Sequence, residues 1–130
     1  MSDIIKEINK KNNVFKIGKI SKDKIVSAEN MLGLNFANEY KKYLCEFGVA
    51  SYEEHELTGI CDSKRLNVVD VTLEEKQYNN NVPDDFYVIE QAHIDGIVIW
   101  QSEKGEIFQT YPNGKPIKIF DSLAEYITQM

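Results

Sequence analysis

Short apolar runs separated by turn-forming residue pairs fill the C-terminal third of this 130-residue chain. The runs are FYVIEQA, IVIWQ, IFQTY and IKIF, and they extend from Phe86 to Phe120. Asp95-Gly96 follows the first run, and Asn113-Gly114 follows the third. These pairs are strong hairpin signals, because Asp, Asn and Gly accept the positive φ angles that tight hairpins need. The region therefore predicts an antiparallel meander of about four strands.

Two helical patterns, each followed by a glycine, precede the strands. Residues 22–32 predict a helix that ends at Gly33, where a left-handed residue is expected. The residues up to Phe47 predict a second helix, capped by Asn35 or Asn38 and ended by Gly48. The short link between them predicts a helical hairpin. The residues expected on the buried faces are Ile25, Ala28, Met31 and Leu32 in the first helix and Tyr40, Tyr43, Leu44 and Phe47 in the second.

Shorter helices are expected at both ends of the chain. Isoleucines recur at helical spacing near the N-terminus, and an apolar stripe follows residue 122 near the C-terminus. Each stripe has a suitable capping residue in front of it. The candidate caps are Ser2 or Asp3 for the first helix and Asp121 or Ser122 for the last.

The segment from Asn67 to Tyr78 fits two interpretations. Its β-branched residues favour a strand by propensity. Asn67 and Asp70, however, form a variant of a capping arrangement, and the β-branched residues also fit one helical face. We expect a helix, which the asparagines at 79–81 and then Pro83 would end.

The order of helices, then strands, then a helix predicts an α+β fold rather than a βαβ nucleotide-binding fold. The expected architecture is an N-terminal helical hairpin and a C-terminal helix packed on an antiparallel, meander-type sheet of about four to six strands. The length predicts a single domain, residues 1–130, with one core. Without an apolar run of roughly 20 residues or a signal peptide, we expect a cytoplasmic protein with no membrane partner. Cys45 and Cys61 fit a reduced compartment, and the sequence gives a disulfide between them no positive support but leaves it open.

Charge is sorted along the sequence. Residues 1–48 contain nine lysines and six acidic residues, a net charge of +3, whereas residues 49–130 carry a net charge of −9. Between Glu53 and Asp95, eleven acidic residues accompany only Lys64, Arg65 and Lys76. Such a segment is usually a solvated face, but its field also attracts a protein with a basic surface. The scarcity of clustered Lys and Arg argues against direct binding of nucleic acid.

No catalytic or metal-binding pattern stands out. His55, His93 and Cys61 are the residues from which a base and a nucleophile would have to come, but their spacing matches no known motif. Glu53 to Glu56 include metal-ligand types, yet consecutive strand residues point to opposite faces. Zinc, EF-hand and phosphate-loop motifs are missing. We therefore expect no enzyme activity, no cofactor and no metal, and a small-molecule pocket between sheet and helices stays open.

The helical hairpin carries a recognisable arrangement of apolar residues and glycines. Its parts are Ala28-Glu29…Leu32-Gly33-Leu34, then Tyr40-Lys41-Lys42-Tyr43-Leu44, then Phe47-Gly48. Together with Glu56-Leu57-Thr58-Gly59 and the terminal Phe120…Leu123…Tyr126-Ile127, this resembles the SUKH superfamily, the Smi/Knr-type domain, from about Ile20 to Ile127. Phe36 stands where that family often has proline, and Phe47 where it often has Asn or Tyr.

The resemblance implies a binding function. Bacterial SUKH proteins are mostly immunity proteins that bind a cognate toxin, often a nuclease, and their eukaryotic relatives are regulatory scaffolds. We therefore expect a non-catalytic module that neutralises a toxin with a basic surface, with a regulatory or adaptor domain as the alternative. The toxin and the oligomeric state stay open, and the family has no fixed set of contact residues to transfer. From charge, the contacts are assigned to Glu53, Glu54, Glu56, Asp70, Glu74, Glu75, Asp84 and Asp85, with Tyr52, Tyr78 and Trp100 as apolar anchors.

Overall fold

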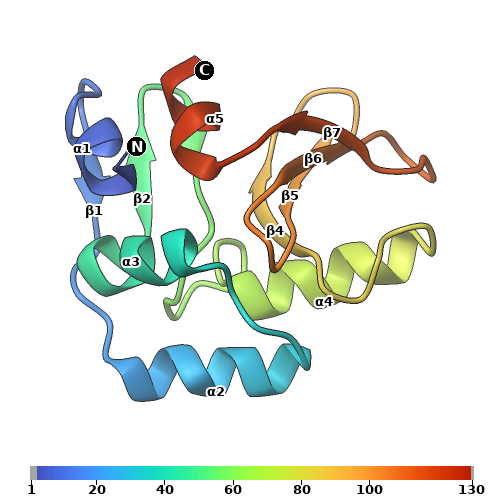
Figure 1. Cartoon of the computed structure of the whole chain (residues 1–130), viewed down its shortest axis with the longest axis horizontal. Coiled ribbons are helices and arrows are strands. Elements are labelled where there is room, and N and C mark those ends of the chain that lie inside the picture. Colours follow the sequence, from blue (N-terminus) through green and yellow to red (C-terminus); the bar gives the residue numbers. More distant parts are fainter. Residues whose placement is uncertain (1–2, 130) are drawn as a thin grey trace.

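The computed structural model describes residues 3–129, which form two antiparallel sheets and the helices that pack on them (Figure 1). The helices are α1 (Ile4–Asn9), α2 (Lys22–Leu32), α3 (Asn38–Phe47), α4 (Val68–Tyr78) and α5 (Leu123–Gln129). The strands are β1 (Phe15–Lys16), β2 (Ala50–Tyr52), β3 (His55–Glu56), β4 (Tyr87–Gln91), β5 (Val98–Gln101), β6 (Ile107–Thr110) and β7 (Ile117–Phe120). The α+β prediction is confirmed.

The four strands from β4 to β7 form the predicted meander, and each pairs with the next one along the chain. Asp95, Gly96 and Asn113 have positive φ angles in its turns, as the hairpin signals predicted. A smaller sheet of β1, β2 and β3 lies beside α1 (Figure 1), and its strand β3 contacts β4 of the meander. The segment from Asn67 onward is helical, because the Asn67 side chain accepts the backbone N–H groups of Val69 and Asp70.

Both faces of β4 are buried. On one face, Tyr87 and Ile89 of β4 join the main hydrophobic core with residues of α1, α2, α3 and α5. On the other face, Val88 and Trp100 pack in a second cluster against Val71 of α4. Since side chains alternate along a strand, β4 contributes to both clusters. The result is a sheet with the main core on one side and α4 on the other.

A hydrogen-bond network around Thr58 connects α3 to β4. The hydroxyl of Tyr43 donates to the Thr58 carbonyl at 2.7 Å and accepts the Ala50 N–H at 2.9 Å. The Thr58 hydroxyl donates to the Val88 carbonyl at 2.7 Å, and its backbone N–H donates to the Ile89 carbonyl at 2.8 Å. The outer edge of β4 is therefore paired with the chain after β3 instead of being left open.

Two details of the predicted helical hairpin are wrong. Met31 is 65% exposed, and Glu29 is buried in its place, because the Glu29 carboxylate accepts the Phe36 N–H at 2.7 Å. The N-cap of α3 is Ala37 and neither of the predicted asparagines. The Ala37 N–H donates to the hydroxyl of Tyr87, which lies 50 residues along the chain. Distant side chains thus hold the backbone of the connection that leads into α3, and α3 itself has no side-chain cap.

Local capping explains the two terminal helices. The Asp3 side chain accepts the Ile5 N–H, as predicted, and the alternative cap Ser2 lies outside the described residues. The Ser122 hydroxyl accepts the Glu125 N–H. Glu39 of α3 adds a carboxylate at this end, where it accepts the N–H groups of Leu123 and Ala124 at 2.6 and 2.9 Å. A negative charge at a helix N-terminus is stabilising, so Glu39 connects α3 to α5.

Two buried tyrosines test the hydrogen-bond network around Thr58, because the hydroxyl of Tyr43 belongs to it and the hydroxyl of Tyr52 has no partner in the described residues. Tyr43→Phe leaves the Ala50 N–H and the Thr58 carbonyl without their partner, so we expect a loss of about 1–3 kcal/mol in the free energy of unfolding. Tyr52→Phe removes a buried hydroxyl that has no hydrogen-bond partner in the described part of the chain, and we expect no loss. Urea unfolding of both variants measures the difference, and equal losses would contradict the network.

Stability should fall in alkaline solution. Burial raises the pKa of five of the seven tyrosines, namely Tyr40, Tyr43, Tyr52, Tyr87 and Tyr126. In the unfolded chain these groups ionise near about pH 10. Their contribution to stability is therefore complete below about pH 10 and decreases above it, because the unfolded chain then loses protons first. Phenolate absorbance and circular dichroism, recorded together, should show these five tyrosines ionising only as the helices unfold.

Candidate partner-binding surface

The acidic segment does not form a single face, which corrects the simplest expectation from charge. Glu53 and Glu54 form the turn between β2 and β3, close to α5. Asp70, Glu74 and Glu75 belong to α4, which lies along the opposite edge of the molecule (Figure 1). Asp84 and Asp85 lie in the connection from α4 to β4. The predicted contacts are therefore divided into a hairpin group and an α4 group.

Some of these carboxylates already have partners. Glu56 makes a two-fold ion pair with Arg65, at 2.7 and 2.9 Å, and the guanidinium lowers the pKa of Glu56. Asp85 accepts the backbone N–H of Glu103 at 3.2 Å. Within residues 3–129, no ion pair or hydrogen bond engages the side chains of Glu53, Glu54, Asp70, Glu74 and Asp84.

Burial removes two of the three predicted aromatic anchors. Tyr52 and Trp100 are each 1% exposed, so neither ring is available for a surface contact. Tyr52 packs against the His55 ring, with the ring centres 5.2 Å apart, and the Trp100 indole N–H donates to the Thr110 hydroxyl at 3.0 Å. Tyr78 is 66% exposed at the C-terminal end of α4, so this anchor stays a candidate.

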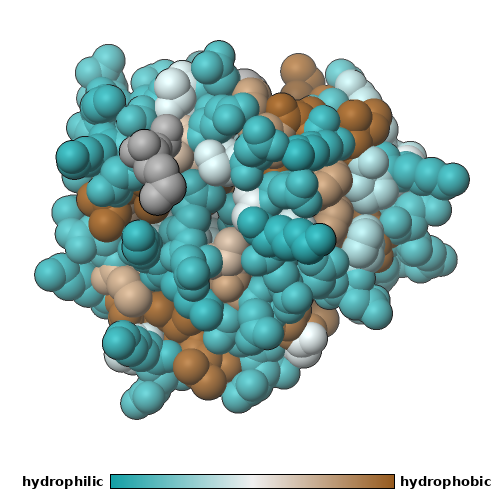
Figure 2. Space-filling model, viewed as in Figure 1, coloured by the Kyte–Doolittle hydropathy of each residue, from teal (hydrophilic) through white to brown (hydrophobic). Residues whose placement is uncertain are grey.

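Surface apolar groups are scattered over the view in Figure 2. Hydrophilic side chains cover most of that face, and apolar residues occur as separate patches between them. A hollow elsewhere combines the two kinds of side chain. It lies between α4 and strands β5 and β6, has a volume of about 470 Å³, and is called the α4 groove below. Glu75 and Tyr78 line it from α4, and Tyr111 lines it from the end of β6.

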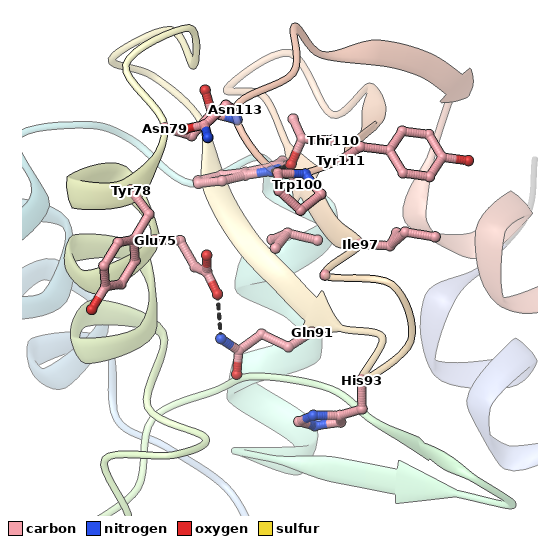
Figure 3. Close-up of a pocket in the computed structure, with 13 residues that line it drawn as sticks. Glu75, Tyr78, Asn79, Gln91, His93, Ile97, Trp100, Thr110, Tyr111 and Asn113 are labelled. Atoms are coloured by element: carbon pink, nitrogen blue, oxygen red, sulfur yellow. Dashed lines mark hydrogen bonds between the residues drawn. The ribbon is translucent and has the colours of Figure 1, made fainter.

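Figure 3 shows how these side chains lie. Trp100 is at the centre of the groove, and Tyr78 and Tyr111 are on opposite sides with their rings directed outward. The amide of Gln91, at the end of β4, donates to the Glu75 carboxylate across the groove. At the other end, the Asn79 amide donates to the Gly114 carbonyl at 2.9 Å. Helix and sheet are thus connected at both ends of the groove.

A family model supplies the first comparison with known proteins. The model, SUKH_5, is described as SMI1-KNR4 cell-wall, and it matches residues 1–130. The chain belongs to the SUKH superfamily. The resemblance on the helical hairpin therefore identified the family correctly.

The SUKH fold is also found in a solved structure. A protein from Pseudomonas syringae pv. tomato superposes with a TM-score of 0.75, and the match covers 95% of this chain and 92% of that chain. The two sequences are 16% identical, so the likeness shows the fold alone. No curated protein matches this chain.

Two of the three candidate catalytic residues, His55 and Cys61, are engaged in other contacts, and His93 is exposed. His55 Nδ1 lies 3.0 Å from the buried Glu90 carboxylate, and the Cys61 thiol donates to the Ser63 carbonyl at 3.4 Å. Burial raises the pKa of Cys61, which disfavours the reactive thiolate. In the region from Asp3 to Gln129, no group of three or more His, Cys, Asp or Glu side chains is placed to bind a metal. Over the same residues, no helix has the length and apolarity that crossing a membrane requires.

Sequence reasoning missed part of the groove. Tyr111 is 48% exposed, and it follows β6 directly, so that it lines the groove together with Tyr78 of α4. Its place next to Pro112-Asn113-Gly114 was the one available signal, because residues that flank a hairpin turn are often exposed. Gln91 gave no signal, since its contact with Glu75 depends on how α4 packs on β4.

The position of α4, and with it the groove, depends on Thr72. The Thr72 hydroxyl accepts the Val88 N–H at 2.9 Å, and Thr72 is fully buried. Thr72→Val keeps the shape but leaves that N–H unpaired, so we expect a loss of about 1–3 kcal/mol in the free energy of unfolding. Thr72→Ser keeps the hydroxyl and is expected to lose less. Urea unfolding measures both variants, and a larger loss for serine would contradict this role of the hydroxyl.

Proposed function

We propose that this SUKH chain is an immunity protein, a non-catalytic module that binds and neutralises a cognate toxin of a bacterial polymorphic toxin system. Family membership carries the proposal, because bacterial SUKH proteins mostly have this role. The formal net charge of −6 supports a toxin with a basic surface, such as a nuclease. The site of action would be the cytoplasm, where a nuclease toxin reaches its substrate.

The inhibition would be steric and electrostatic. A nuclease binds its substrate through Lys and Arg side chains that contact phosphates. Carboxylates on a rigid helix would occupy that positive surface and exclude the nucleic acid. Asp70 and Glu74 of α4 suit this role, since their side chains are exposed and have no partner among residues 3–129. Complementary charge would also accelerate the encounter, which a cell needs when the toxin is lethal.

A regulatory or adaptor domain is the second candidate. Membership of the superfamily supports this candidate too, because its eukaryotic relatives are regulatory scaffolds. Such a domain would bind an endogenous partner and would give no protection against a toxin. Growth assays therefore separate the two functions.

Co-expression with candidate toxins encoded beside this gene tests the proposal. The immunity protein should restore growth and should bind the purified toxin with an affinity that decreases as salt increases. Growth arrest in the presence of this chain, with no complex formed, would refute the immunity function. A complex with an endogenous protein and no protection would instead support the adaptor function.

Charge variants of the two acidic groups locate the contact. Asp70→Asn with Glu74→Gln should reduce the rate of association with the toxin by on the order of tenfold at low salt. Glu53→Gln with Glu54→Gln removes the same charge from the β2–β3 turn and serves as the matched control, with a smaller effect expected. Stopped-flow measurements compare the rates. Equal effects of the two pairs would contradict a contact at α4.

A further inference from the structure

The α4 groove has the features of an anchoring site for a partner's side chain. Its volume of about 470 Å³ is in the range of ligand sites, roughly 300–1,000 Å³. A complete protein interface buries about 800 Å² on each partner, so the groove would be the centre of a contact and not all of it. We propose that the α4 groove binds an arginine side chain that projects from a partner with a basic surface, and this rests on the proposed function.

Glu75 determines the charge that the groove accepts. Among the lining residues that the structure describes, Glu75 supplies the one carboxylate, and none is Lys or Arg. The Glu75 side chain is half-buried, and its hydrogen bond from Gln91 gives the carboxylate a defined position. A carboxylate that is partly shielded from water attracts a cation more strongly than one on an open surface. A cationic side chain is therefore the complementary occupant.

The surrounding elements add to the negative field. Residues 68–95, which include α4 and β4, contain seven acidic residues and a single lysine. That lysine, Lys76, donates to the Asp84 carbonyl at 2.8 Å, and burial lowers its pKa. Asp95 lies in the turn that adjoins the groove through His93 and Gly96. A basic partner would thus be steered toward this side of the molecule.

Exposed aromatic rings occur on both sides of the groove. Five of the seven tyrosines are buried, whereas Tyr78 and Tyr111 are 66% and 48% exposed. Figure 3 shows them flanking the hollow over Trp100. Tyrosine is enriched among residues that dominate binding energy, because it provides a large contact area at a low entropic cost. Rings beside a carboxylate also favour a guanidinium, which stacks on aromatic faces.

Arginine fits better than lysine because the groove offers several acceptors. The guanidinium has five N–H donors in a flat, fixed arrangement, whereas the ammonium of lysine has three around a point charge. Glu75 presents two carboxylate oxygens, and the amide oxygen of Gln91 stays available because its nitrogen donates to Glu75. The connections at Gln91 and Asn79 make the groove preformed, so binding would cost little ordering of the protein.

Titration with N-acetyl-L-arginine amide tests the groove without any toxin. Amide NMR spectra should show saturable shifts of the Trp100 indole and Gln91 side-chain signals, with a dissociation constant on the order of 1 mM. The citrulline analogue has the same shape and no charge, and we expect it to bind at least about fivefold more weakly. Shifts that do not saturate, or equal binding of citrulline, would overturn the proposal.

Two variants with matched controls localise the binding. Glu75→Gln keeps the size of the side chain and removes the charge, so the affinity for the arginine amide should fall at least about fivefold. Glu54→Gln removes the same charge from the β2–β3 turn and should change nothing. Tyr78→Ala should also weaken binding, whereas Phe15→Ala, at a ring 65% exposed on β1, should not. Equal effects of a variant and its control would place the binding elsewhere and overturn the proposal.

The same variants separate this inference from the proposed function. With a toxin that this chain neutralises, Tyr78→Ala should raise the dissociation constant about tenfold or more. Unchanged toxin affinity would overturn the groove as an anchor while the immunity function stands. If no toxin is neutralised but the arginine amide binds with the expected charge dependence, the groove stands and the immunity function fails.

Discussion

The structure depends on one strand, β4, that is buried on both faces and along its outer edge. Tyr87 and Ile89 face the main core, and Val88 faces α4. Thr58 and Thr72 satisfy the backbone groups on the edge that β5 does not pair. A buried strand edge with unpaired N–H and C=O groups would cost several kcal/mol, so these two threonines determine where the neighbouring segments lie. The positions of α3, α4 and the chain after β3 follow from β4.

Glu90 adds a second constraint at the end of the same strand. Its buried carboxylate accepts hydrogen bonds from the Tyr126 hydroxyl of α5 and the Glu56 N–H of β3, and it contacts His55. A buried carboxylate is tolerated because these partners replace water. One side chain thus joins the meander, the smaller sheet and the C-terminal helix. It belongs to the acidic segment by sequence, yet it has no part in the surface charge.

The α4 groove is a consequence of the same packing. The Thr72 hydroxyl of α4 accepts a hydrogen bond from Val88 of β4, the first strand of the meander. Helix α4 therefore covers β4 more fully than it covers β5 and β6. Trp100 then forms the base of a hollow, and the residues at its edges come from segments up to 38 residues apart, from Glu75 to Asn113. A rigid surface of this kind suits the proposed function, because ordering a flexible one on binding would weaken a complex.

Sequence patterns predicted the local structure where local chemistry decides it. Gly33 adopts the left-handed conformation after α2, Asn67 caps α4, and both hairpin signals lie in turns. The predictions failed where distant groups decide. Met31 is exposed, and Glu29 takes the buried position and accepts the Phe36 N–H; the N-cap of α3 is Ala37, whose N–H donates to the distant Tyr87 hydroxyl.

The site shows the same division. Charge and the family pattern follow from residues near one another in the chain, and the sequence alone determined the α+β class and the SUKH membership. Only the tertiary structure decided that the acidic residues form two groups, that Tyr52 and Trp100 are buried, and that Glu75, Gln91 and Tyr111 surround one hollow. Helix and strand signals act over a few residues, whereas burial depends on which faces of distant elements meet.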